Sequence, residues 1–280
     1  MNFSILHQNI PEVMDFLLFV MVAGVVAYLL FFLFGESPFN FLTDIRCMAL
    51  FSKVTAPNYR KLLLQNFVVY KMLDENGRRK FEKRVCRFIR MKDFRAGKNI
   101  DKITDEMRVL VAASAIQLTY GYPDLYFQHF KTIILYAEEY YSPLTGQYHQ
   151  GEVNAGGAIV LSWNNFRAGF NNLNDGRNLA MHEMAHALRL SNIFDNQGYD
   201  FIDRDALFEF EHLAKEEMMI IEDGKNSFFR LYGGTNLHEF FSVAVECFFE
   251  QPQEFNSYNS HLYELMTRIL RIDLLNFTNE

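Results

Sequence analysis

Residues 179–188 read LAMHEMAHAL, an apolar, helix-favouring run that carries the pattern H-E-x-x-H. On an α-helix, positions four apart lie on one face, so His182 and His186 can both reach a single metal ion. Glu183 then lies beside the open coordination position, where it can take a proton from a water molecule. Two histidines and a glutamate are poorly placed in an apolar helix without a partner. The pattern therefore predicts one zinc ion per chain rather than an ordinary core helix.

A zinc centre of this kind needs a third protein ligand. The spacing H-E-x-x-H-x-x-G-x-x-H is excluded, because Arg189 and Asn192 occupy its last two positions. The alternative is a glutamate from a later helix, as in His₂Glu zinc sites. His212 and His238 are rival ligands.

The helix predicted over 238–250 is apolar apart from one narrow face that carries Glu239, Glu246 and Glu250. Because buried unpaired carboxylates are costly, this face meets either solvent or a compensating charge. Zinc and the N–H groups of its histidines would compensate it. We therefore expect Glu239 to be the third ligand and Glu246 to orient a ligand histidine. A solvent-exposed helix face is the alternative for Glu246 and Glu250.

The composition excludes other classes of function. The formal net charge is -7, and no stripe of basic residues interleaved with aromatic residues is present, so we expect no direct nucleic-acid partner. The three cysteines are far apart and form no CxxC pair. They are typical of reduced thiols in a cytosolic protein.

An uncharged apolar run covers residues 16–34 and is long enough to cross a bilayer as one helix. No basic residue precedes Arg46, which argues against a signal peptide and, by the positive-inside rule, places the C-terminal part in the cytoplasm. The run predicts a single-pass protein of the cell membrane, with the membrane as a partner through this N-terminal helix.

The organisation predicted from these patterns is a transmembrane anchor (1–36), a linker with amphipathic helices (37–72) and a zinc-dependent peptidase domain (73–280). We expect an α+β fold that is mainly helical, with a small sheet. The sheet is predicted from strands at 131–136 and 157–163. The second strand precedes the metal helix, and it either lies along the cleft, where an extended peptide can pair with its edge, or is an interior strand.

Several motifs together resemble the MtfA (Mlc titration factor A) family of zinc-dependent peptidases of bacteria, peptidase family M90. The resemblance extends from about Leu73 to about Leu265. The matching pieces are F-x-x-x-K-x-F at 88–94, ITDEM at 103–107, LSW at 161–163, HEMAH at 182–186, Y-G-x-T-x-x-x-E-F-F at 232–241 and FFE-x-P at 248–252.

The resemblance implies a gluzincin-like metallopeptidase with helices packed around a small sheet. Carried over position by position, His182, His186 and Glu239 would bind zinc. Glu183 would be the general base, and the Tyr232 hydroxyl would stabilise the developing oxyanion.

Two features depart from the family pattern. Arg189 stands where many members carry an acidic residue, and the apolar N-terminal run lies outside the matched region. We expect a membrane-anchored zinc metallopeptidase acting on a peptide or protein substrate. The alternative is a regulatory binding protein that sequesters a transcriptional regulator or another cytosolic partner.

Overall fold

The computed structural model describes, besides a few helical positions between 18 and 29, residues 56–143, 145–194 and 200–277. The chain divides into two units, Met1–Lys53 and Val54–Glu280, and the fold described here is that of the second. The boundaries at 36 and 72 that the sequence suggested stay a prediction.

The prediction of a single-pass membrane protein with a cytoplasmic catalytic domain was wrong. In the part of the chain that the structure describes, no helix has both the length and the apolar character that crossing a bilayer requires. The prediction rested on hydropathy alone, whereas a membrane span also requires an unbroken helix of about 20 residues. Most of 16–34 lies outside the described residues.

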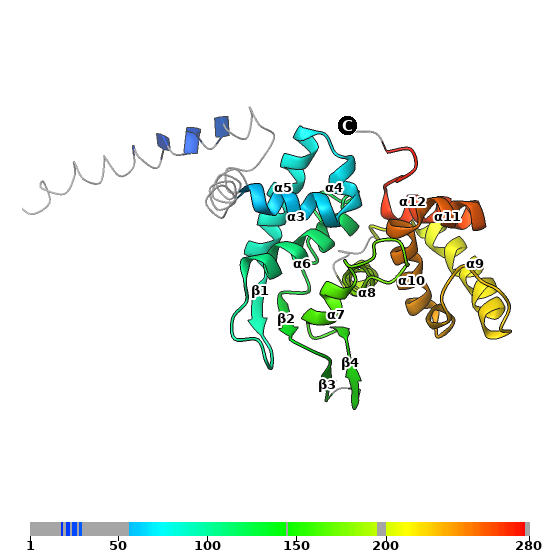
Figure 1. The fold of residues 1–280 in the computed structure, drawn as a ribbon. Coiled ribbons are helices and arrows are strands. Elements are labelled where there is room, and N and C mark those ends of the chain that lie inside the picture. The colour runs from blue at the N-terminus through cyan, green and yellow to red at the C-terminus, as the bar shows by residue number, and fades with distance from the viewer. Residues whose placement is uncertain are drawn as a thin grey trace, which may run out of the picture. The chain divides into compact units, whose positions relative to one another are not determined.

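Helices dominate the second unit (Figure 1). They are α3 (Ala56–Asn66), α4 (Val68–Met72), α5 (Glu75–Met91), α6 (Asp105–Leu118), α7 (Trp163–Ala168), α8 (Leu179–Phe194), α9 (Arg204–Glu222), the 3-10 helix η1 (Leu231–Gly234), α10 (Leu237–Glu250), α11 (Pro252–Tyr258) and α12 (Ser260–Leu270). The helix α8, which carries H-E-x-x-H, packs against α6, α7, α10 and one strand of the sheet.

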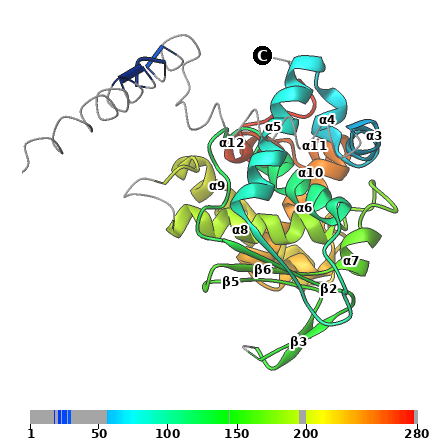
Figure 2. The same cartoon turned by 90° about the vertical axis from the view of Figure 1, so that its left-hand side faces the viewer.

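The main sheet has four strands in the order β1-β2-β6-β5. They are β1 (Asp93–Ala96), β2 (Thr132–Tyr136), β6 (Ala158–Ser162) and β5 (Gly151–Asn154). The first three run parallel, and β5 pairs antiparallel with β6. A separate hairpin consists of β3 (Tyr140–Ser142) and β4 (Gln147–His149). In Figure 2 the helices α6 and α8 lie above the sheet. The prediction of a mainly helical α+β fold with a small sheet is confirmed.

Of the two predicted strands, the second corresponds to β6, which is an interior strand between β2 and β5. The interior alternative is therefore the correct one for this strand. The strand at this edge of the sheet is β5, which packs against α8 and which the sequence did not predict.

Side-chain caps fix where two of the helices begin. The Oδ1 atom of Asn236 accepts hydrogen bonds from the N–H groups of His238 and Glu239 at 2.9 and 3.1 Å, so α10 begins at Leu237 and Glu239 lies in its first turn. Thr104 is the N-cap of α6, and its side chain accepts from the N–H of Met107 at 3.2 Å.

An aromatic core holds α10 in place. The ring of Phe210 on α9 lies 6.0 and 5.6 Å from the rings of Phe240 and Phe241, and Phe229 lies 4.9 Å from Phe240. All four side chains are 3% exposed or less. Each buried ring contributes about 2–3 kcal/mol to stability, so the apolar side of α10 is firmly fixed and its acidic face is turned away from this core.

Candidate metal centre

The two histidines of α8 lie one turn apart, with ring centroids separated by 4.8 Å. His182 is 6% exposed and the intervening Glu183 is 4% exposed. Asn178 starts the helix, because its carbonyl accepts from the N–H of His182 at 2.9 Å and its Oδ1 accepts from Met181 at 3.2 Å. The local sequence thus directs both imidazoles to the same face of α8.

Three ligand-type atoms converge on this face, two from α8 and one from α10. The Nε2 atom of His182 lies 2.9 Å from Oε2 of Glu239 and 3.2 Å from Nε2 of His186. The third side of the triangle, from His186 Nε2 to Glu239 Oε2, is 3.4 Å. Ligands of a tetrahedral zinc ion stand about 3.3 Å from one another, since each lies about 2.0 Å from the metal. The three atoms therefore fit a zinc ion without a change of backbone.

The outer nitrogen of each imidazole has its own acceptor. His182 Nδ1 lies 2.8 Å from Oε1 of Glu246, and His186 Nδ1 lies 3.3 Å from Oγ of Ser242. When Nδ1 of a neutral imidazole donates its proton, Nε2 carries a lone pair. Both Nε2 lone pairs and the Glu239 carboxylate then face one another, which is the donor set that a cation requires.

The Glu246 carboxylate, only 1% exposed, is held by donors from three segments. Besides the contact with His182, its Oε1 accepts a hydrogen bond from Nη2 of Arg230, with which Glu246 forms an ion pair. Its Oε2 accepts from the N–H of Asn178 at 2.6 Å. Glu246 is therefore a buried, hydrogen-bonded group that orients the His182 ring. Sequence reasoning did not find Arg230 or Asn178. Asn178 had a signal as the polar residue before the helix, whereas nothing in the pattern marks Arg230.

Glu250 lies one turn beyond Glu246 and also binds the start of α8. Its Oε1 accepts from Nδ2 of Asn178 at 3.0 Å and its Oε2 from the N–H of Arg177 at 3.2 Å. Burial raises the pKa of Glu250 to about 7. Both carboxylates are at most 8% exposed, so the alternative of a solvent-exposed helix face does not hold for Glu246 or Glu250.

The other residues singled out in the sequence lie outside the converging group. His238 is exposed, and His212 forms a pair with Glu216 on the exposed side of α9. Among the described residues, the one group of potential ligands consists of His182, His186 and Glu239. Arg189 donates to Glu211 at 2.6 Å, so its charge is compensated by α9.

The charges of the group are strongly coupled. Burial lowers the pKa of His182, but hydrogen bonds to Glu239 and Glu246 outweigh burial and raise it to about 9. Burial acts upward on Glu239, yet its hydrogen bonds to His182 and His186 hold its pKa well below the usual range. In the metal-free chain a proton is thus favoured between His182 and Glu239, in the position for which a metal ion would compete.

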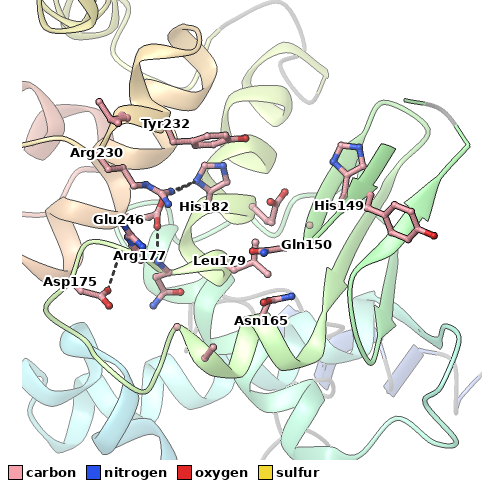
Figure 3. A pocket seen from close by; sticks show the side chains of 17 residues that line it. His149, Gln150, Asn165, Asp175, Arg177, Leu179, His182, Arg230, Tyr232 and Glu246 are labelled. Atoms are coloured by element: carbon pink, nitrogen blue, oxygen red, sulfur yellow. Dashed lines mark hydrogen bonds and ion pairs between the residues drawn. The ribbon is translucent and has the colours of Figure 1, made fainter. Parts of the chain in front are cut away.

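A pocket of about 840 Å³ opens over the centre (Figure 3). His182, Arg230 and Tyr232 lie on one side of it and His149 of β4 on the other, and Glu183 and Gly151 also line it. The Tyr232 ring centroid lies 5.7 Å from that of His182. Burial, followed by the nearby Glu239 and Glu183 carboxylates, raises the pKa of Tyr232 to about 12, so its phenol stays protonated and can donate a hydrogen bond.

An H-E-x-x-H helix joined by a later glutamate in an open pocket is the arrangement found in metal-dependent hydrolases. The chain belongs to the family of glucose-regulated metallo-peptidases M90, whose model matches residues 44–271. The resemblance to the MtfA family is thereby confirmed. The chain is also 27% identical to the uncharacterized protein slr2042 of Synechocystis sp. over 244 residues, which cover 80% of this chain and 87% of that protein. The family is one of metallopeptidases, which implies a metal ion.

Proposed function

We propose that this chain is a zinc-dependent peptidase of the gluzincin type, which uses water to hydrolyse peptide bonds. The observation that carries the proposal is the convergence of His182 Nε2, His186 Nε2 and Glu239 Oε2 within a triangle of 2.9 to 3.4 Å. Two imidazoles and one carboxylate are the three protein ligands of many catalytic zinc sites, where the fourth position is open. Zinc bound there would polarise the substrate carbonyl and favour deprotonation of a water molecule.

Glu183 is the general base in this proposal. Its side chain lines the pocket beside His182 and forms no hydrogen bond or ion pair with any residue that the structure describes. Both carboxylate oxygens are therefore available to a water molecule. Glu183 accepts a proton from the attacking water and passes it to the leaving amine nitrogen, a role that contributes about 10²–10⁴-fold to the rate.

Tyr232 supplies the oxyanion donor. Its phenol is protonated at neutral pH, lines the same pocket, and lies on η1 directly before α10. A neutral donor near the substrate carbonyl strengthens its hydrogen bond as negative charge develops on that oxygen. The hydrogen bond from Tyr232 would therefore stabilise the transition state more than the bound substrate.

The outer edge of β5, with which no strand of the described residues pairs, offers a place for an extended peptide. The N–H of Ser162 donates to the carbonyl of Gln150 at 2.7 Å, and Gly151 stands opposite Leu161 in the register. Along an antiparallel edge strand, the backbone N–H and C=O groups of one residue bond to the neighbouring strand and those of the next residue face away from it. Gly151 and Val153 therefore turn their backbone groups to the outer edge, where a substrate strand can pair with them.

The test combines metal content with hydrolysis of a mixed peptide pool by the purified full chain. We expect about one zinc per wild-type chain and chelator-sensitive cleavage. Glu239→Ala loses zinc, whereas the matched control His238→Ala, altered at the neighbouring exposed position, retains both zinc and cleavage. Glu183→Gln retains zinc and loses cleavage.

The outcomes separate the alternatives. Full cleavage by Glu183→Gln would refute the proposed general base. Zinc in the wild type without cleavage of any peptide would instead favour the regulatory binding protein, whose partner binding should then survive removal of zinc. Equal zinc content in Glu239→Ala and wild type would refute the third ligand.

A further inference from the structure

The first residue of β5, Gly151, lies directly against the side chain of Glu183. A Cβ atom at residue 151 would stand 2.4 Å from Oε1 of Glu183 and 2.5 Å from both Cγ and Cδ. Contacts this short between non-bonded heavy atoms lie far inside the optimal separation of about 3.5–4.0 Å. Glu183 therefore occupies the space in which any other residue would carry its side chain.

The need for glycine here comes from space and not from backbone conformation. Gly151 is absent from the glycines with positive φ, which are Gly146, Gly157, Gly176 and Gly224 among the described residues. An alanine could adopt the same backbone angles, and the three atoms nearest to its Cβ would all belong to the Glu183 side chain.

The strand is held more firmly than the carboxylate. Gly151 stands opposite the fully buried Leu161 in the register of β5 and β6, and the neighbouring Gln150 carbonyl accepts the 2.7 Å hydrogen bond from Ser162. The Glu183 carboxylate has no hydrogen bond or ion pair with the described residues. If the two collide, the carboxylate is the part that moves.

We propose that Gly151 is a positioning residue, whose missing side chain keeps the Glu183 carboxylate beside the metal centre. The proposal rests on the proposed role of Glu183 as general base. Hydrogen bonds to Glu246 and Ser242 orient the rings of His182 and His186. Glu183 has no such partner among the described residues and is positioned by packing against Gly151 instead. Such a partner would compete with water for the carboxylate oxygens, whereas packing fixes the position and leaves both oxygens available.

Gly151→Ala tests the proposal in the full chain. Its Cβ displaces the Glu183 carboxylate by about 1 Å or more, and a misplacement of this size costs about a hundredfold in rate. We expect kcat to fall about a hundredfold, with KM and zinc content close to wild type, because the atoms nearest to a Cβ at residue 151 belong to Glu183 and not to a ligand. A crystal structure of the zinc-loaded variant should show the Glu183 carboxylate moved away from β5.

Gly156→Ala is the matched control in the turn that follows β5. A Cβ at Gly156 would meet only Oδ1 of Asn154, at 3.2 Å. Gly156 follows the last residue of β5, whereas Gly151, which contacts Glu183, is the first. This variant should keep wild-type kcat, KM and zinc content. If Gly151→Ala does not fold, the double variant with Glu183→Ala decides, since it restores the space and should fold.

The results that overturn the proposal are distinct from those that overturn the peptidase. A wild type that cleaves nothing refutes the proposed function, yet the carboxylate position in Gly151→Ala still decides this inference. The inference is wrong if that carboxylate stays in place while β5 shifts, if the loss lies in KM or in zinc content, or if kcat is unchanged. It is also wrong if the double variant fails to fold.

Discussion

Glu246→Gln should weaken metal binding although Glu246 is not a ligand. The substitution keeps the size and shape of the side chain and removes its charge. The carboxylate now serves three donors, with His182 Nδ1 at 2.8 Å, the N–H of Asn178 at 2.6 Å and the Arg230 guanidinium beside them. An amide has one acceptor oxygen, and its NH₂ group would face at least one of these donors.

The expected magnitude follows from what each donor loses. Removing the carboxylate partner of a ligand histidine typically lowers metal affinity about 10–100-fold, or about 1.4–2.7 kcal/mol. In the metal-free protein, a buried N–H left without an acceptor costs about 1–3 kcal/mol of unfolding free energy. Competition with a chromogenic chelator measures the zinc Kd, and urea denaturation in excess chelator measures the stability.

Glu254→Gln provides the control. Glu254 is exposed on α11, and its substitution makes the same chemical change away from the candidate metal centre. Its zinc Kd should equal that of the wild type. A zinc Kd for Glu246→Gln within twofold of the control would refute the reasoning, since the His182 ring would then be oriented without its carboxylate partner.

Three further predictions concern a pH dependence, the oxyanion donor and the substrate edge. Burial raises the pKa of Glu250 to about 7 from 4.5, so the native chain binds more protons between these values and loses stability as the pH rises through them. Glu250→Gln should remove about 2–3 kcal/mol of this loss between pH 5 and 8 in urea denaturation, and an unchanged pH dependence would contradict the assignment. Tyr232→Phe should keep zinc and lower kcat about 10²–10³-fold, whereas Tyr148→Phe, also in the pocket wall, should not; similar kcat values for the two would exclude the oxyanion role. Val153→Pro removes an outward N–H and should raise KM about fivefold, while Glu152→Pro removes an inward bond to β6 and should lower stability by about 1–3 kcal/mol. An unaffected KM in Val153→Pro would show that the substrate does not pair with this edge.

The elements that the sequence predicted are those with a local signal. The Thr104 cap and the small apolar residues that follow it are sufficient to predict α6, and the four-residue spacing of His182 and His186 predicts a shared face on α8. By contrast, β5 is a strand of only four residues, GEVN, and its Gly and Asn are residue types depleted in strands. Its pairing with β6 makes it a strand, and that contact is tertiary.

The candidate site divides in the same way. The helical wheel placed Glu239 and Glu246 on one face but left open whether this face meets solvent or charge. The answer depends on Arg230 and Asn178, which lie 16 and 68 residues from Glu246 along the chain. The membrane span predicted at 16–34 rested on hydropathy, whereas no helix in the described part of the chain is both long and apolar enough to cross a bilayer.

The acidic face of α10 acquires its function from the apolar side of the same helix. Successive residues on an α-helix are about 100° apart, so a rotation of α10 by one position would carry Glu239 away from both histidines. Phe240 and Phe241, packed against Phe210, prevent this rotation, because they would have to leave a fully buried aromatic core. The aromatic core thus fixes the candidate metal centre from a distance. The strand that carries Gly151 lines the same pocket, so Glu183, the proposed general base, stands between α10 and β5.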